Sequence, residues 1–69
     1  MELTQREQQI MRMICNGAEN TEIADSMGKG LGTIRINVSE ILRKLGAKNR
    51  TQAAVLWTRA QLTGAGKIG

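Results

Sequence analysis

Positive charge in this 69-residue chain is concentrated in one segment, residues 29–50, where it could bind phosphate groups. The segment contains a single carboxylate, Glu40, whereas residues 1–28 contain two arginines and five carboxylates. Phosphate-binding surfaces typically carry such a cluster of cations, but a solvated helix face without a partner can carry one too. Charge alone therefore does not distinguish these two interpretations. The cations of the segment are Lys29, Arg35, Arg43, Lys44, Lys48 and Arg50.

The residue types give little support to catalytic chemistry. The chain has no histidine, hence no imidazole base, and its carboxylates are scattered. Cys15 has no neighbouring base, so we expect a buried structural thiol. The glycine-rich stretches 28–33 and 64–69 do not match a phosphate loop, since Gln61 and Ile68 replace residues that this motif requires. We therefore expect that the chain is not an enzyme and has neither a cofactor nor a metal site.

Length and composition predict one small all-α domain. Hydrophobic residues make up 41% of the chain and are nearly all aliphatic, with no Phe, Tyr or Pro. A single cysteine favours a reducing cytoplasm. No stretch reaches the roughly 18 apolar residues of a membrane span, and no signal peptide is recognisable. We expect a domain over residues 1–63 and a flexible glycine-rich tail over residues 64–69.

Capping and glycine signals predict four helices. Thr4 and Glu7 match a capping box, so the first helix begins there and continues to about Asn16. The second helix is short, with Asn20 as its N-cap. The third extends from about Leu31 to Leu45, and the fourth begins at the cap Asn49, with Gln52 completing the pattern, and fades near Leu62. The expected stop residues are Gly17, Gly28 and Gly46.

The spacing of Ala24, Gly28 and Ile34 favours a helix-turn-helix. This motif needs a small residue where two helices touch, a glycine in the turn and a β-branched residue early in the second helix. The third helix has a core-facing stripe of Ile34, Val38, Ile41, Leu42 and Leu45. Its opposite side presents Gly32, Thr33, Arg35, Ile36, Ser39, Glu40, Arg43 and Lys44.

An exposed isoleucine beside an exposed arginine suits a helix that enters the major groove of DNA. Arg35 could bond guanine, and Ile36 could touch a thymine methyl group. Arg43 and Lys44 lie two turns further on, within reach of the phosphate backbone. The alternative for Ile36 is an isolated apolar residue at the surface, which is common.

The fourth helix has two faces in the sequence. Ala53, Leu56, Trp57 and Ala60 are expected to pack on the core, with Trp57 as a core filler. An apolar pair on the outward face suits a two-fold contact between copies, so we expect a weak homodimer. The outward residues are Val55, Thr58, Arg59 and Leu62.

The chain resembles the DNA-binding domain of the LuxR/FixJ/NarL family of bacterial transcription regulators. The matching segments, within residues 3 to about 57, are LTQRE, EIA, TIR, ILRKLG and NRTQA. The resemblance implies a four-helix domain whose third helix reads the major groove of double-stranded DNA. It also implies pairing of two domains through the fourth helix on an inverted repeat. RNA polymerase is a further expected partner, and a small-molecule ligand or a membrane is not.

Roles of single residues follow from the same resemblance. Thr33 falls where a hydroxyl contacts phosphate, Arg35 where a base edge is reached, and Ile36 where a small apolar residue lies against bases. Glu7 is implied to pair with an arginine, for which Arg50 is the candidate, so Arg50 has either a structural or a DNA-contacting role. The full expected DNA-binding set is Lys29, Gly32, Thr33, Arg35, Ile36, Ser39, Arg43, Lys44, Lys48 and Arg50.

The chain departs from the family pattern at the turn. Lys29 stands where an aliphatic side chain is usual, Gly30 caps less well than serine, and Gly32 lowers helix propensity unless it permits a close approach to phosphate. Ser39 stands where a second basic reader is frequent. Two functions therefore stay open: regulation of transcription by specific duplex binding, or a protein-interaction module that heterodimerises with a fuller regulator and binds DNA weakly.

Overall fold

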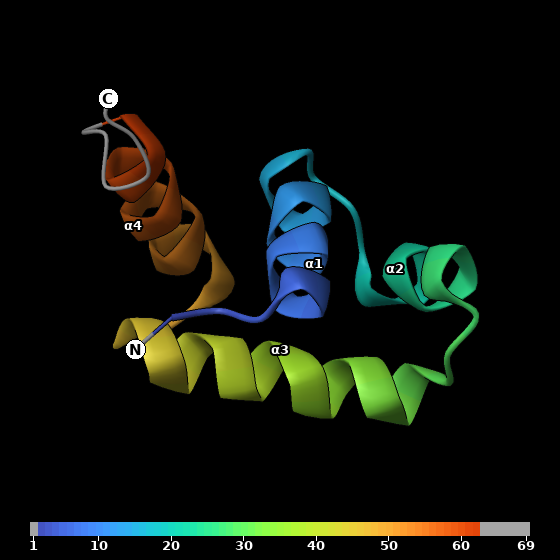
Figure 1. Ribbon diagram of the computed structural model, residues 1–69. Coiled ribbons are helices and arrows are strands. Elements are labelled where there is room, and N and C mark those ends of the chain that lie inside the picture. The colour runs from blue at the N-terminus through green and yellow to red at the C-terminus, as the bar shows by residue number, and fades with distance from the viewer. Residues whose placement is uncertain (1, 63–69) are drawn as a thin grey trace.

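The computed structural model describes residues 2–62 of the chain. These residues form four helices and the connections between them. Their bounds are α1 Gln5–Cys15, α2 Asn20–Met27, α3 Leu31–Leu45 and α4 Arg50–Leu62. In Figure 1, α1 stands on the middle of α3, with α2 and α4 on either side of α1. The predicted all-α class is confirmed. The predicted tail, residues 64–69, lies outside the described residues, so that division of the chain stays a prediction.

The start of α1 is the predicted capping box. The Glu7 N–H donates to Thr4 Oγ1 at 3.1 Å, and the Thr4 N–H donates to Glu7 Oε1 at 2.9 Å. These two bonds satisfy backbone donors that the first turn of a helix leaves free. Asn16 closes the helix, and Gly17 follows in the left-handed region at φ +86°.

The start of α2 differs from the prediction by one residue. Its N-cap is Glu19, whose N–H donates to the Glu22 carboxylate at 2.7 Å, and Asn20 is the first helical residue. The Asn20 side chain has another partner, since its Oδ1 accepts a hydrogen bond from Arg50 at 2.7 Å. Gly28, at φ +65°, ends α2 as predicted. Only residues 28–30 separate α2 from α3, which gives the tight turn of a helix-turn-helix.

The limits of α3 and the cap of α4 agree with the sequence signals. Gly46 adopts φ +69° directly after α3. Asn49 Oδ1 accepts the Gln52 N–H at 2.8 Å, as an N-cap should. In the reciprocal bond, Gln52 Oε1 accepts from the Lys48 N–H, one residue before the cap, at 2.6 Å.

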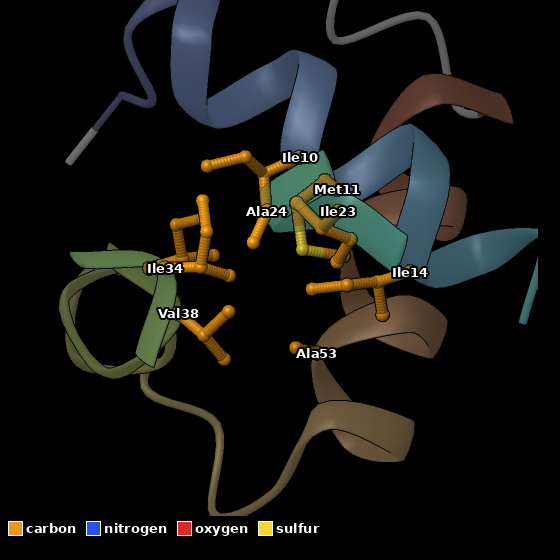
Figure 2. Packing of buried hydrophobic residues seen from close by; sticks show 9 residues of the cluster. Ile10, Met11, Ile14, Ile23, Ala24, Ile34, Val38 and Ala53 are labelled. Carbon is orange, nitrogen blue, oxygen red and sulfur yellow. The ribbon is translucent and has the colours of Figure 1, made fainter. Parts of the chain in front are cut away.

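One hydrophobic core joins all four helices (Figure 2). The three positions of α3 that face it, Ile34, Val38 and Ile41, are buried, and Leu42 and Leu45 pack at its edge. This confirms the predicted stripe of α3. The buried cluster consists of Ile10, Met11, Ile14, Ile23, Ala24, Ile34, Val38, Ile41 and Ala53.

Two burial predictions are wrong. Leu56 is 36% exposed, because α4 turns the stripe of Ala53, Ala54 and Trp57 toward the core and leaves Leu56 at its side. Cys15 is exposed rather than buried, because the inward stripe of α1 is centred on residues 10, 11 and 14. Its Sγ lies 3.9 Å from Thr58 Oγ1. Trp57 packs against the core, as predicted.

Candidate nucleic-acid interface

One side of α3 is open along its length. In Figure 1 the other three helices all lie on the opposite side of α3. Ile34 is fully buried, whereas Ile36, two residues further on, is 68% exposed. The exposed residues of this open side are Gly32, Thr33, Arg35, Ile36, Ser39 and Arg43.

The Arg35 side chain is exposed and has no hydrogen-bond or ion-pair partner within residues 2–62. Its guanidinium therefore presents all of its donors to solvent. A planar fork of N–H donors matches the O6 and N7 acceptors of guanine and the oxygens of a phosphate. With Ile36 beside it, the start of α3 offers a polar and an apolar contact to the same surface.

The turn before α3 presents backbone donors and a lysine. Gly30 caps the helix with extended backbone and no side-chain hydrogen bond, and the first turn has no acidic residue. The N–H groups of that turn are thus available to an anion, and the helix dipole favours negative charge there. Lys29 is exposed, and a Cβ placed on Gly32 would meet nothing within 4 Å. The backbone of Gly32 is accordingly open to close approach.

Arg43 differs from Arg35 because it has a partner on its own helix. Its Nη2 donates to Glu40 Oε1 at 2.6 Å and its Nε to Glu40 Oε2 at 3.2 Å. The hydrogen bond with Glu40 raises the pKa of Arg43, and the same bond lowers the pKa of Glu40. Both groups are therefore charged at neutral pH, and the pair is neutral as a whole.

Lys44 faces α1 and not the open side of α3. Its Nζ donates to Glu7 Oε1 at 2.8 Å and Oε2 at 3.0 Å, and the two side chains are only 16% and 14% exposed. Burial alone would raise the pKa of Glu7, but hydrogen bonds from Lys44 and Thr4 outweigh it, and the pKa is lowered. The expected pairing of Glu7 with Arg50 is therefore wrong, and Lys44 is the partner.

Arg50 joins the start of α4 to the connection between α1 and α2. Its Nη1 donates to Asn20 Oδ1 at 2.7 Å and its Nη2 to the Ala18 carbonyl oxygen at 2.8 Å. The guanidinium is partly buried by these contacts, which is a structural environment. Nothing in the sequence marks Ala18 or Asn20 as a hydrogen-bond partner of Arg50. The Arg43–Glu40 pair, in contrast, could have been found from the three-residue spacing along one helix.

The outward face of α4 carries apolar side chains in solvent. Val55 is 44% and Leu62 is 81% exposed, and Leu56 adds to them at 36%. Thr58 and Arg59 are also exposed. Among the described residues, no group of three or more side chains could hold a metal ion, and no helix is long and apolar enough to cross a membrane.

Four helices around a helix-turn-helix, with an open and basic start to the second helix of that motif, define a DNA-binding domain of the helix-turn-helix class. The family model for bacterial regulatory proteins of the luxR family matches residues 1–57. The chain belongs to this family, whose members are DNA-binding regulators of transcription.

Full-length relatives carry the same domain. The chain is 46% identical over 52 residues to the uncharacterized transcriptional regulatory protein YvfU of Bacillus subtilis. It is 42% identical over 53 residues to the response regulator protein VraR of Staphylococcus aureus, and 35% identical over 54 residues to the putative HTH-type transcriptional regulator YhjB of Escherichia coli. These matches cover 75%, 77% and 78% of this chain but only 26%, 25% and 27% of the relatives. The chain therefore spans about a quarter of their length.

Proposed function

We propose that this domain regulates transcription by binding a specific DNA duplex with the start of α3 in the major groove. The observation that carries the proposal is the unpartnered Arg35 next to the exposed Ile36 on the open side of α3. Arg35 reads guanine through two hydrogen bonds, and Ile36 packs on a thymine methyl group. Membership of the luxR family supports duplex DNA as the partner.

Phosphate contacts position the helix in this proposal. Lys29, Thr33 and the N–H groups at the start of α3 contact one strand, and Lys48, beyond the end of α3, contacts the backbone elsewhere. Gly32 permits close approach, and Ser39 offers a hydroxyl group to the groove. Lys44 and Arg50 take structural roles here, because their cationic groups have internal partners.

The proposal includes a homodimer on an inverted repeat. Val55, Leu56 and Leu62 expose apolar surface on α4, next to the exposed Thr58 and Arg59. Two-fold symmetry of a dimer would match two half-sites of a palindrome. Sedimentation at high concentration, with and without duplex, tests this part; a monomer in both conditions excludes it. Contact with RNA polymerase is a further proposal, to be tested by pull-down with the purified enzyme.

The central test is duplex binding by an arginine variant. Selection from a random pool gives the preferred site, its symmetry and its half-site spacing. Arg35→Ala should then cost about 1–3 kcal/mol on that site and relax the preference at one base pair. Arg12→Ala is the matched control, because Arg12 is exposed toward the end of α1 that lies away from α3 in Figure 1. Equal affinities of Arg35→Ala and the parent chain would exclude the proposed reading face.

The alternative, a protein-interaction module, is favoured by the apolar side chains on α4. A salt titration separates the two functions. Duplex binding should weaken as salt rises, with log K falling by about 0.9 per phosphate neutralised for each unit of log salt. A chain that binds duplex weakly and without this dependence, yet captures a full-length relative, would support the alternative.

A further inference from the structure

Glu40 is the single carboxylate of the basic segment, and it lies on the DNA-facing side of α3 in the proposed function, on which this inference rests. It follows Ile36 by four residues and precedes Arg43 by three, so the three side chains form one ridge along the helix. The Glu40 side chain is 46% exposed and that of Arg43 is 61% exposed. A negative charge in this position needs an explanation, since DNA presents phosphates to the same surface.

The geometry ties Glu40 to Arg43 through both carboxylate oxygens. Two donors of Arg43, Nη2 and Nε, are directed at Oε1 and Oε2. This parallel arrangement is the strongest that an arginine and a carboxylate make. It directs those two donors along α3 and leaves fewer of them for a phosphate.

The electrostatic consequence falls mainly on binding that does not depend on sequence. Each cation that neutralises a phosphate releases counterions whatever the bases are, whereas base discrimination comes from contacts in the groove. A neutral Glu40–Arg43 pair withholds one such cation from the phosphate contacts. The Arg35 side chain has no ion-pair partner within residues 2–62, so its contact with a base is left unchanged.

We propose that Glu40 limits the affinity of this domain for duplex DNA: by holding Arg43 and offsetting its charge, it removes one phosphate contact and lowers affinity for every duplex by a similar factor. Discrimination between base sequences is left to the contacts that Arg35 and Ile36 make in the groove. Glu40 does not read a base in this proposal, although a carboxylate can accept a hydrogen bond from cytosine N4.

The test compares Glu40→Gln with the parent chain on two duplexes, the selected site and an unrelated sequence, over about 50–200 mM salt. Releasing Arg43 should steepen the salt dependence by about 0.9, the value for one phosphate. Affinity for both duplexes should rise by a similar factor, roughly threefold or more at the low-salt end, so the ratio of the two affinities should stay the same. Thermal unfolding confirms that the exposed substitution leaves the fold intact.

Two further variants isolate the pair. Glu19→Gln makes the same change of charge outside α3, in the connection that precedes α2, and should leave the salt dependence of binding unchanged. Arg43→Gln in the Glu40→Gln background should return the salt dependence to that of the parent chain, because the released cation is removed.

Other outcomes overturn the inference in distinguishable ways. If Glu40→Gln weakens binding only to the selected site, and substitution of one cytosine in that site has the same effect, then Glu40 is a base reader. If Glu40→Gln changes neither affinity nor salt dependence, the pair has no role in binding. If the parent chain binds duplex without salt dependence, the proposed function fails, and this inference fails with it.

Discussion

Arg35 and Lys44 are cations on the same helix, nine residues apart, yet their surroundings are opposite. Arg35 is exposed near the start of α3 and has no side-chain partner within residues 2–62. Lys44, near the end of α3, is 16% exposed and holds Glu7 of α1. One end of the helix is therefore free to bind a ligand, while the other end is used to fix the helix to the domain.

The comparison shows that a count of charges overstates the surface available to phosphate. Residues 29–50 contain six cations. Lys44 and Arg50 bind partners in α1, α2 or the connection between them, and Arg43 is paired on the surface. Lys29, Arg35 and Lys48 are exposed, and among the described residues their side chains have no ion-pair partner. The open positive charge is thus at the turn, at the start of α3 and in the α3–α4 connection.

Loss of Lys44 should have the largest effect on stability. Lys44→Met removes both hydrogen bonds to Glu7 and leaves a carboxylate that is only 14% exposed, which should cost about 2 kcal/mol. For a domain of this size, Tm should fall by roughly 10 °C. Lys48→Met makes the same chemical change at an exposed lysine and should leave Tm nearly unchanged. Equal melting of the two variants would remove the distinction between the ends of α3.

Arg50→Ala should lower stability by about 1.5 kcal/mol, because α4 loses two hydrogen bonds to Ala18 and Asn20. Urea unfolding measures this effect. Arg50→Lys should restore only part of it, since a lysine cannot reproduce the planar fork. Duplex affinity, measured where both proteins are folded, should stay the same. A loss of affinity without a loss of stability would show that Arg50 contacts DNA.

Acid should weaken the contact between α1 and α3. The pKa of Glu7 in the folded chain lies below its ordinary value of 4.5, so its contribution to stability is complete above about pH 4.5. The contribution is lost as the pH falls through the lowered pKa. Unfolding free energies from pH 7 to 3 should therefore converge for the parent chain and Glu7→Gln, which keeps a capping side chain but loses the ion pair. A constant difference across this range would contradict the role of the charge.

Gly32→Ala should give the smallest change in stability and should separate folding from binding. A Cβ at this position meets nothing within 4 Å, so the helix should gain about 0.5–1 kcal/mol. The added methyl group would stand between the backbone and the duplex, so affinity should fall while Tm rises. If affinity rises together with Tm, the glycine has no part in a close approach to DNA.

The sequence predicts the helices of this domain well because their signals are local. The capping box of Thr4 and Glu7, the cap Asn49 and the glycine stops act within a few residues of the chain. The limits of α3 are as predicted. Its division into a buried and an exposed side also follows from the helical period, which is why Ile34 and Ile36 were assigned to opposite sides correctly.

Predictions that depended on how a helix is rotated about its own axis, relative to its neighbours, were less accurate. Leu56 was assigned to the core as part of the inward face of α4, and Cys15 was assigned to it although it lies toward the edge of the apolar side of α1. Burial at such positions depends on how far a helix is rotated toward its neighbour. The period of the helix does not contain that rotation.

The sequence by itself determined four helices, a helix-turn-helix and an arginine beside an isoleucine on the outer side of α3. The tertiary structure alone decided which cations are internal, by placing Lys44 against Glu7 and Arg50 against Ala18 and Asn20. The physical reason is the separation between interacting residues along the chain. Caps and helical stripes depend on neighbours three or four residues away, whereas the partners of these two cations lie 30 to 37 residues away along the chain and meet them only after packing.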